Sequence, residues 1–260
     1  MSTIDVPLKN GGFGRTARTD GWWVEPLLVF LGYMSFIVYA TWAGMQGNNY
    51  ELIGTNYLSP MYSPVLMRTA PGWWPSILPF SAAMLILWAP GGFRLTCYYY
   101  RGAYYKAFWA DPPSCAVGEP RKTYWGEKSF PLILQNVHRY FLYLAILFVC
   151  ILTYDGIRSF CFPGPDGANH FGIGVGSLVL IANPILLGLY TFGCHSLRHL
   201  VGGKLDSMSK SPARKKTYDC VSCLNRSHML WAWLSMFYVG FADLYVRLCA
   251  MGIWHDWRIL

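Results

Sequence analysis

Charged side chains are scarce in this sequence, and carboxylates are the scarcest of them. Asp, Glu, Lys and Arg make up 13% of the 260 residues, about half the roughly 25% of typical soluble domains. Hydrophobic residues make up 54% and fall in long runs. This composition excludes an ordinary soluble domain and predicts an all-α, polytopic membrane protein. The formal net charge of +8 does not indicate a nucleic-acid partner, because basic membrane proteins carry their positive charge in cytoplasmic loops.

Two sequence signals are also missing. Residues 1–20 contain no apolar stretch of the kind found in cleaved signal peptides, so the first helix is expected to insert uncleaved. No glycine-rich nucleotide motif follows a strand, so flavin-dependent dehydrogenation is not expected in this chain.

The eight Cys do not suggest disulfides, because most lie in or beside apolar segments. Thiols that face the cytosol stay reduced and are available to metals.

Five segments reach the roughly 20 residues that are needed to cross a hydrocarbon layer of about 30 Å. After a cytoplasmic tail at 1–22, and within a single transmembrane domain spanning 1–260, helices are predicted at about 24–44, 75–98, 136–157, 173–195 and 228–251. Pro90 interrupts the second helix and Pro184 the fourth. Each proline frees a carbonyl, so both positions are expected to face protein or a cavity rather than lipid.

The distribution of Lys and Arg sets the orientation. Fourteen lie in the N-terminal tail and in the second and fourth connections: Lys9, Arg15, Arg18, Arg101, Lys106, Arg121, Lys122, Lys128, Lys204, Lys210, Arg214, Lys215, Lys216 and Arg226. Three lie in the other connections and the C-terminal tail: Arg68, Arg158 and Arg258. Because positive charge marks cytoplasmic loops, the N-terminus is predicted inside and the C-terminus outside.

On this topology, His and Cys residues gather at the inner membrane level. Cys97 ends the second helix, His138 opens the third and His228 opens the fifth. The inner end of the fourth helix carries Cys194, His195 and His199, and a cytoplasmic loop carries Cys115. His195 and His199 are four residues apart and would share one helix face. Ionisable residues at such depth are costly and usually mark function.

Imidazole and thiolate together suit zinc, copper or an iron–sulfur cluster. Two His and two Cys around two irons is the Rieske pattern. A pair of b haems is the main alternative. Two haems would need His ligands near both membrane faces, and the outer ends of these helices carry none. A heavy-metal-binding transporter is a third alternative. It would want carboxylates inside the helices, where only Asp155 and Asp243 lie, both toward the outer side.

Several runs of this sequence resemble one known family. They are RLTCYYYR at 94–101, PPSCAVGEP at 112–120, FPLILQNVHRY at 130–140, CHSLRHLVGG at 194–203 and ADLYV at 242–246. Together they resemble the single-subunit membrane anchor of type F succinate dehydrogenases, a bacterial branch of respiratory complex II. The resemblance runs from the first helix to the end of the chain.

This resemblance implies a multi-pass subunit of the bacterial cytoplasmic membrane, in contact with lipids. Its partners would be a flavoprotein subunit, which oxidises succinate, and an iron–sulfur subunit, which relays the electrons. The anchor would hold a quinone site, for menaquinone or ubiquinone, and a Rieske-type [2Fe–2S] cluster in place of haem b. The number of complexes that associate is left open.

The resemblance does not select the cluster ligands one by one. The candidates are Cys97, Cys115, Cys194, His138, His195, His199 and His228, and we expect two Cys and two His of this set to bind the cluster. Cys194 and His195 are adjacent and would point about 100° apart on a helix, so they are not expected to bind one iron together. Candidate quinone neighbours are Tyr98, Arg139 and Trp231, all near the inner level.

Overall fold

The computed structural model describes residues 12–77, 79–120, 128–130, 132–203 and 207–260. Four of the described helices are long and apolar enough to cross a membrane: Val24–Gln46, Ile133–Arg158, Val175–Phe192 and His228–Ala250. The chain is therefore a multi-pass helical protein, as predicted. It divides into two compact units, residues 1–37 with 94–137 and residues 38–93 with 138–260.

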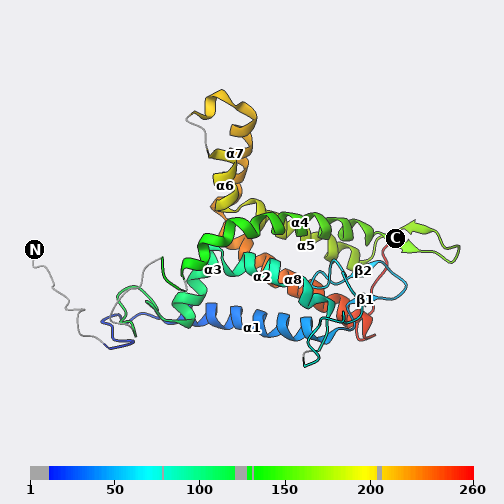
Figure 1. Ribbon diagram of the computed structural model, residues 1–260, viewed down its shortest axis with the longest axis horizontal. Helices are drawn as coiled ribbons and strands as arrows, with labels where there is room; N and C mark the ends of the chain where they lie inside the picture. Colours follow the sequence, from blue (N-terminus) through cyan, green and yellow to red (C-terminus); the bar gives the residue numbers. More distant parts are fainter. Residues whose placement is uncertain (1–11, 78, 121–127, 131, 204–206) are drawn as a thin grey trace, which may run out of the picture. The chain divides into compact units, whose positions relative to one another are not determined.

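The elements run in the following order (Figure 1). They are α1 (Val24–Gln46), β1 (Glu51–Leu52), β2 (Tyr57–Leu58), η2 (Ala82–Leu85), α2 (Trp88–Leu95), α3 (Tyr98–Gly102), η3 (Ala103–Phe108), η4 (Leu132–Val137), α4 (His138–Arg158), β3 (Cys161–Pro163), β4 (Asn169–Phe171), α5 (Val175–Phe192), α6 (His195–Gly202), η5 (Met208–Lys210), α7 (Pro212–Arg226) and α8 (His228–Ala250). The strands form two short antiparallel hairpins, β1 with β2 and β3 with β4.

The predicted helix at 75–98 is wrong as one continuous element. The segment begins as a loop, and its regular parts are the 3-10 turn η2 and the eight-residue α2. Pro79 lies four residues inside the predicted helix, where its missing amide hydrogen and its ring prevent a helix from running through it. Cys97 is extended (φ −66°, ψ 135°) and ends the run before α3 begins. A hydropathy average counts the apolar residues but does not register these breaks.

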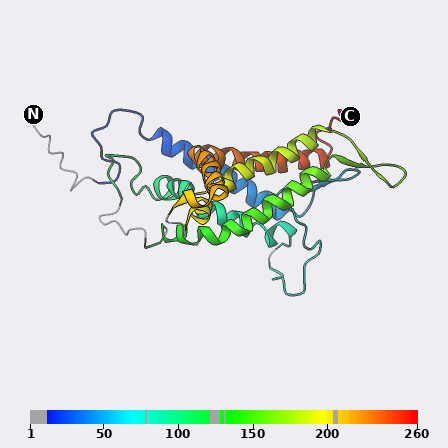
Figure 2. The same ribbon diagram turned by 90° about the horizontal axis from the view of Figure 1, so that it is seen from above.

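The second unit is built around α5, which packs against α4 on one side and α8 on the other (Figures 1 and 2). Close approach to α4 depends on Gly156, because an added Cβ there would lie 3.1 Å from the Cα of Ile181. Small residues at such crossings let helix backbones pack closely in a membrane. Asn183 and Pro184 lie inside α5 and are buried, which agrees with the prediction that the interruption faces protein.

A buried ion pair ties α8 to the last part of α1 and to the chain that follows it. Asp243 and Arg247, four residues apart on α8, are 0% and 2% exposed, with Arg247 Nε 3.5 Å from Asp243 Oδ2. Tyr39 donates a hydrogen bond of 2.6 Å to Oδ2, and Ser59 donates one to Oδ1. Arg247 Nη1 donates to the carbonyl of Asn48 at 3.0 Å. The ADLYV run at 242–246 therefore contributes Asp243 to a buried network of structural hydrogen bonds in this protein.

Candidate imidazole–thiol site

Two of the predicted ligands are in direct contact. His138 is the first residue of α4, and its Nε2 lies 3.1 Å from the Sγ of Cys194. Both side chains are buried, with exposures of 6% and 1%. Phe93 stacks on the His138 ring, with centroids 4.4 Å apart and an angle of 13° between the planes. The imidazole is thus held flat against an apolar ring, with one nitrogen directed at the thiol.

Cys194 reaches His138 because α5 ends before it. The helix stops at Phe192, Gly193 follows with ψ at 0°, and Cys194 takes an extended conformation (ψ 138°) as the N-cap of α6. Asn225 of α7 fixes this break by donating a hydrogen bond of 2.8 Å from Nδ2 to the Gly193 carbonyl. The predicted helix at about 173–195 therefore ends three residues early, at Phe192, and α6 begins separately at His195.

His228 lies beside the same break. It is the first residue of α8, is 1% exposed, and stacks on Tyr190 with ring centroids 5.0 Å apart. Tyr190 also contacts the edge of Phe93 at 5.3 Å. Two aromatic rings therefore connect the two buried imidazoles.

Gly193 provides a direct test of this packing. A Cβ on Gly193 would lie 2.8 Å from the Leu189 carbonyl oxygen and 3.1 Å from His228 Nδ1. Gly193→Ala is therefore expected to displace the imidazole and to destabilise the chain by about 1–3 kcal/mol, measured by thermal unfolding of the purified complex. Gly188→Ala, whose Cβ would meet side chains no closer than 3.6 Å, is the matched control. Equal effects of the two variants would contradict the packing described here.

His195 and His199 lie in a different environment. They form a pair on α6 with their Nε2 atoms 3.0 Å apart, and both are exposed. Partial desolvation lowers the pKa of His195, and the nearby His199 and Arg198 lower it further. The shared helix face that the spacing predicts is confirmed, but the pair does not share the buried environment of His138, Cys194 and His228.

The two remaining thiols belong to the first unit. Cys97, the N-cap of α3, is 2% exposed. Cys115 is exposed and lies in a loop that Arg18 holds, with Nη1 donating to the Cys115 carbonyl at 3.0 Å. Across the described ranges, His, Cys, Asp and Glu side chains form no group of three arranged around a single metal ion.

The three predicted quinone neighbours differ in what they offer. Trp231 lies on α8 three residues after His228, and its indole Nε1 is buried with no hydrogen-bond partner among the described residues. Arg139 is exposed on α4 and lies over the ring of Tyr140 at 5.1 Å. Tyr98 belongs to the first unit and is 57% exposed. Trp231 is the candidate with an available buried donor.

Sequence reasoning did not identify the side chains that surround the donors. Phe93, Tyr190 and Asn225 contact His138, His228 and the backbone next to Cys194, respectively. Each lies far along the chain from the residue that it contacts, and aromatic residues are frequent here. Only Phe93, one residue before the RLTCYYYR run, lay next to a recognised motif.

The fold and the site together define a multi-pass membrane protein with buried imidazole and thiol groups at one end of its helices. The model of one protein family, the actinobacterial succinate dehydrogenase subunit SdhC, matches residues 24–252. The chain therefore belongs to this family. It is also similar to a chain of a solved structure, the Mycobacterium smegmatis Sdh1 complex in the apo form, with 44% identity, 95% of each chain covered and a TM-score of 0.84. No curated protein matched the chain.

Proposed function

We propose that this chain is the membrane anchor of a succinate:quinone oxidoreductase and that it binds a Rieske-type [2Fe–2S] cluster. The contact between His138 and Cys194 is the observation that carries the proposal, together with the buried His228, which stacks on Tyr190. Burying an ionisable side chain in a membrane protein costs free energy, so such residues usually have a function. Imidazole beside thiol is the donor chemistry of a Rieske cluster, so these residues fit the group. A pair of b haems would not call for the thiol.

Four donors are needed, and burial separates the candidates. His138, His228 and Cys194 are buried, whereas His195 and His199 are exposed. The second unit thus supplies three proposed ligands, and Cys97 and Cys115 remain the predicted candidates for the second thiolate. When bound, such a cluster would supply a one-electron relay between a partner subunit and quinone. The protein's task is to hold the imidazoles, exclude water and place quinone nearby.

At the anchor, one quinone takes up two electrons and two protons and becomes quinol. The electrons come from succinate oxidation on a flavoprotein partner, through an iron–sulfur partner. Both partners are proposed from the family and from the likeness to a chain of an Sdh1 complex. The protons come from water, so the site belongs close to a membrane surface. We place it on the cytoplasmic side because the basic helix α7 belongs to the connection between α5 and α8, which begins beside Cys194.

Trp231 is proposed to donate a hydrogen bond to a quinone carbonyl. Its buried N–H is free for this among the described residues, and a buried donor without a partner costs about 1–3 kcal/mol. Trp231→Phe is expected to raise the KM for quinone about tenfold or more, because the donor is lost while the ring is kept. Trp233→Phe, on another face of α8, is the control. An unchanged KM in Trp231→Phe would remove this residue from the site.

The cofactor proposal is tested by chemical analysis of the purified complex. Iron and acid-labile sulfide should exceed what the iron–sulfur subunit alone contains, and the visible spectrum should show no b-haem bands. Haem bands would instead favour the di-haem anchor. Absence of both haem and additional iron would leave a purely structural anchor. Alanine at each of His138 and His228 in turn should lower the iron content, and unchanged content in both variants would refute the proposal.

A further inference from the structure

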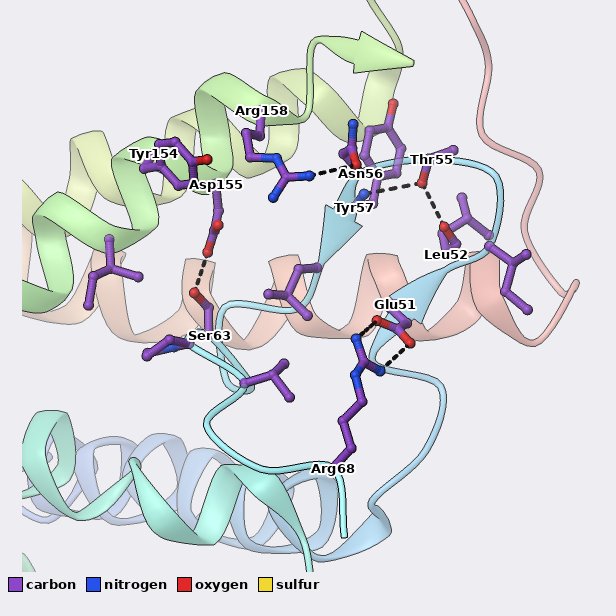
Figure 3. A pocket seen from close by; sticks show the side chains of 15 residues that line it. Glu51, Leu52, Thr55, Asn56, Tyr57, Ser63, Arg68, Tyr154, Asp155 and Arg158 are labelled. Carbon is purple, nitrogen blue, oxygen red and sulfur yellow. Dashed lines mark hydrogen bonds and ion pairs between the residues drawn. The ribbon is translucent and has the colours of Figure 1, made fainter. Parts of the chain in front are cut away.

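A cavity of about 510 Å³ lies at the end of α4 that is remote from His138 (Figure 3). Its walls are the last two turns of α4 and the segment that contains β1 and β2. A helix rises about 1.5 Å per residue, so Asp155 lies about 25 Å along α4 from His138. That separation is close to the thickness of a hydrocarbon layer. The cavity is therefore distinct from the imidazole–thiol site and lies at the other membrane surface.

Two carboxylates line the cavity, Asp155 on α4 and Glu51 on β1. Glu51 pairs with Arg68 through two bonds, Nη1 to Oε1 at 2.7 Å and Nη2 to Oε2 at 3.0 Å. Asp155 accepts a hydrogen bond from Ser63 (Figure 3). A carboxylate can accept about four hydrogen bonds, so both groups keep acceptor positions for a further donor. The cavity can accordingly receive an ammonium group.

Arg158 supplies the opposite charge. Its Nη2 donates to Asn56 Oδ1 at 3.2 Å, and its guanidinium lies 5.9 Å from the centre of the Tyr154 ring. Within the described part of the chain it forms no ion pair, although it lines the same cavity as two carboxylates. A guanidinium has five N–H donors in a planar fork. Its remaining donors suit a phosphate, which guanidinium binds through parallel hydrogen bonds.

A stripe of exposed, mostly apolar side chains on α4 ends at this cavity. Tyr143, Leu147 and Tyr154 are 56%, 53% and 60% exposed. With Ile151 and Arg158 they recur every three or four residues, and so share one helix face. Ile151, Tyr154 and Arg158 also line the cavity. The apolar face that α4 offers to lipid therefore continues directly into a charged pocket at the membrane surface.

We propose that this cavity binds the headgroup of a phospholipid that carries both a phosphate and a primary amine, as phosphatidylethanolamine does. Arg158 would bind the phosphate, Asp155 and Glu51 would accept from the ammonium, and an acyl chain would lie along the stripe at Tyr143 and Leu147. A headgroup with negative charge alone would meet both carboxylates and is disfavoured. The cavity has the size of ordinary small-molecule sites, about 300–1,000 Å³. The proposal does not depend on the cluster or on quinone.

The test uses the whole succinate dehydrogenase complex that contains this chain, delipidated in detergent and titrated with phosphatidylethanolamine or phosphatidylglycerol. Lipid retained on the intact complex is counted by native mass spectrometry. Arg158→Gln is expected to weaken phosphatidylethanolamine binding about tenfold or more, because a hydrogen bond to a charged group is lost. Arg158→Lys should retain most of the binding. Arg226→Gln, an exposed cation on α7, is the charge-matched control.

Each other outcome overturns a defined part of the proposal. Equal retention in Arg158→Gln and Arg226→Gln would refute the site. Preference for phosphatidylglycerol would refute the assignment of the headgroup. Equal affinity for soluble glycerophosphoethanolamine would show a water-soluble ligand rather than a lipid. If Arg158→Gln does not assemble, Ile151→Trp serves instead: it fills the apolar side of the cavity, leaves the charges in place, and is expected to lower lipid retention.

Discussion

Replacing His138, His228 or Cys194 should abolish electron transfer from succinate to quinone while the complex still oxidises succinate with a soluble artificial acceptor. Each of these side chains is buried, and each is proposed to bind the cluster. The partner that oxidises succinate would be untouched, so the two activities should separate. The measurement compares quinone reduction with artificial-acceptor reduction in His138→Ala, His228→Ala and Cys194→Ser.

The two exposed imidazoles provide matched controls for the same chemistry. His195→Ala and His199→Ala each remove an imidazole that faces outward. We expect them to retain most of their quinone reduction. Loss of activity in these two variants with retention in the buried set would reverse the ligand assignment. Loss of both activities in a buried variant would indicate failed assembly, which gel filtration of the complex detects.

The second large effect is expected from the buried ion pair at the opposite end of the helices. Asp243→Ala or Arg247→Ala should each destabilise the chain by about 3–5 kcal/mol, because the remaining charge is left buried without its partner. Asp243 would also leave Tyr39 and Ser59 without their acceptor. The midpoint of thermal unfolding, followed on the purified complex, measures the loss.

Coupling between the two residues distinguishes this account from a general packing defect. The double variant Asp243→Ala with Arg247→Ala should lose clearly less than the sum of the single variants, because no lone charge remains buried. Lys215→Ala removes an exposed pair with Asp219, both about 58–59% exposed, and is expected to cost about 1 kcal/mol or less. Additive losses at Asp243 and Arg247 would contradict a coupled pair.

The sequence predicted the long helices well because their evidence is local. Runs of about 20 apolar residues are directly visible, and the observed helices at Val24–Gln46 and His228–Ala250 begin where predicted. His138 and His228 do open their helices. The segment at 75–98 failed for an equally local reason, since its prolines and glycines interrupt an apolar run that averaging treats as uniform.

Burial is the part of the site that the sequence could not provide. His138 and His199 have the same side chain and the same predicted depth, yet one is buried against Phe93 and the other is exposed. The difference arises at Gly193, where α5 ends and Cys194 turns inward while α6 carries His195 outward. A glycine at a helix end is a visible signal, but the direction of the chain after it depends on contacts from distant segments such as Asn225.

Low-temperature electron paramagnetic resonance, combined with a redox titration of the purified complex, tests the central claim most directly. A Rieske-type cluster is reduced at about −150 to +300 mV, well above the roughly −400 mV of plant-type all-Cys [2Fe–2S] centres. The account predicts a [2Fe–2S] signal that develops in that higher range and disappears in His138→Ala, without b-haem absorption bands. Haem bands without such a signal, or a signal unchanged in both His138→Ala and His228→Ala, would contradict it.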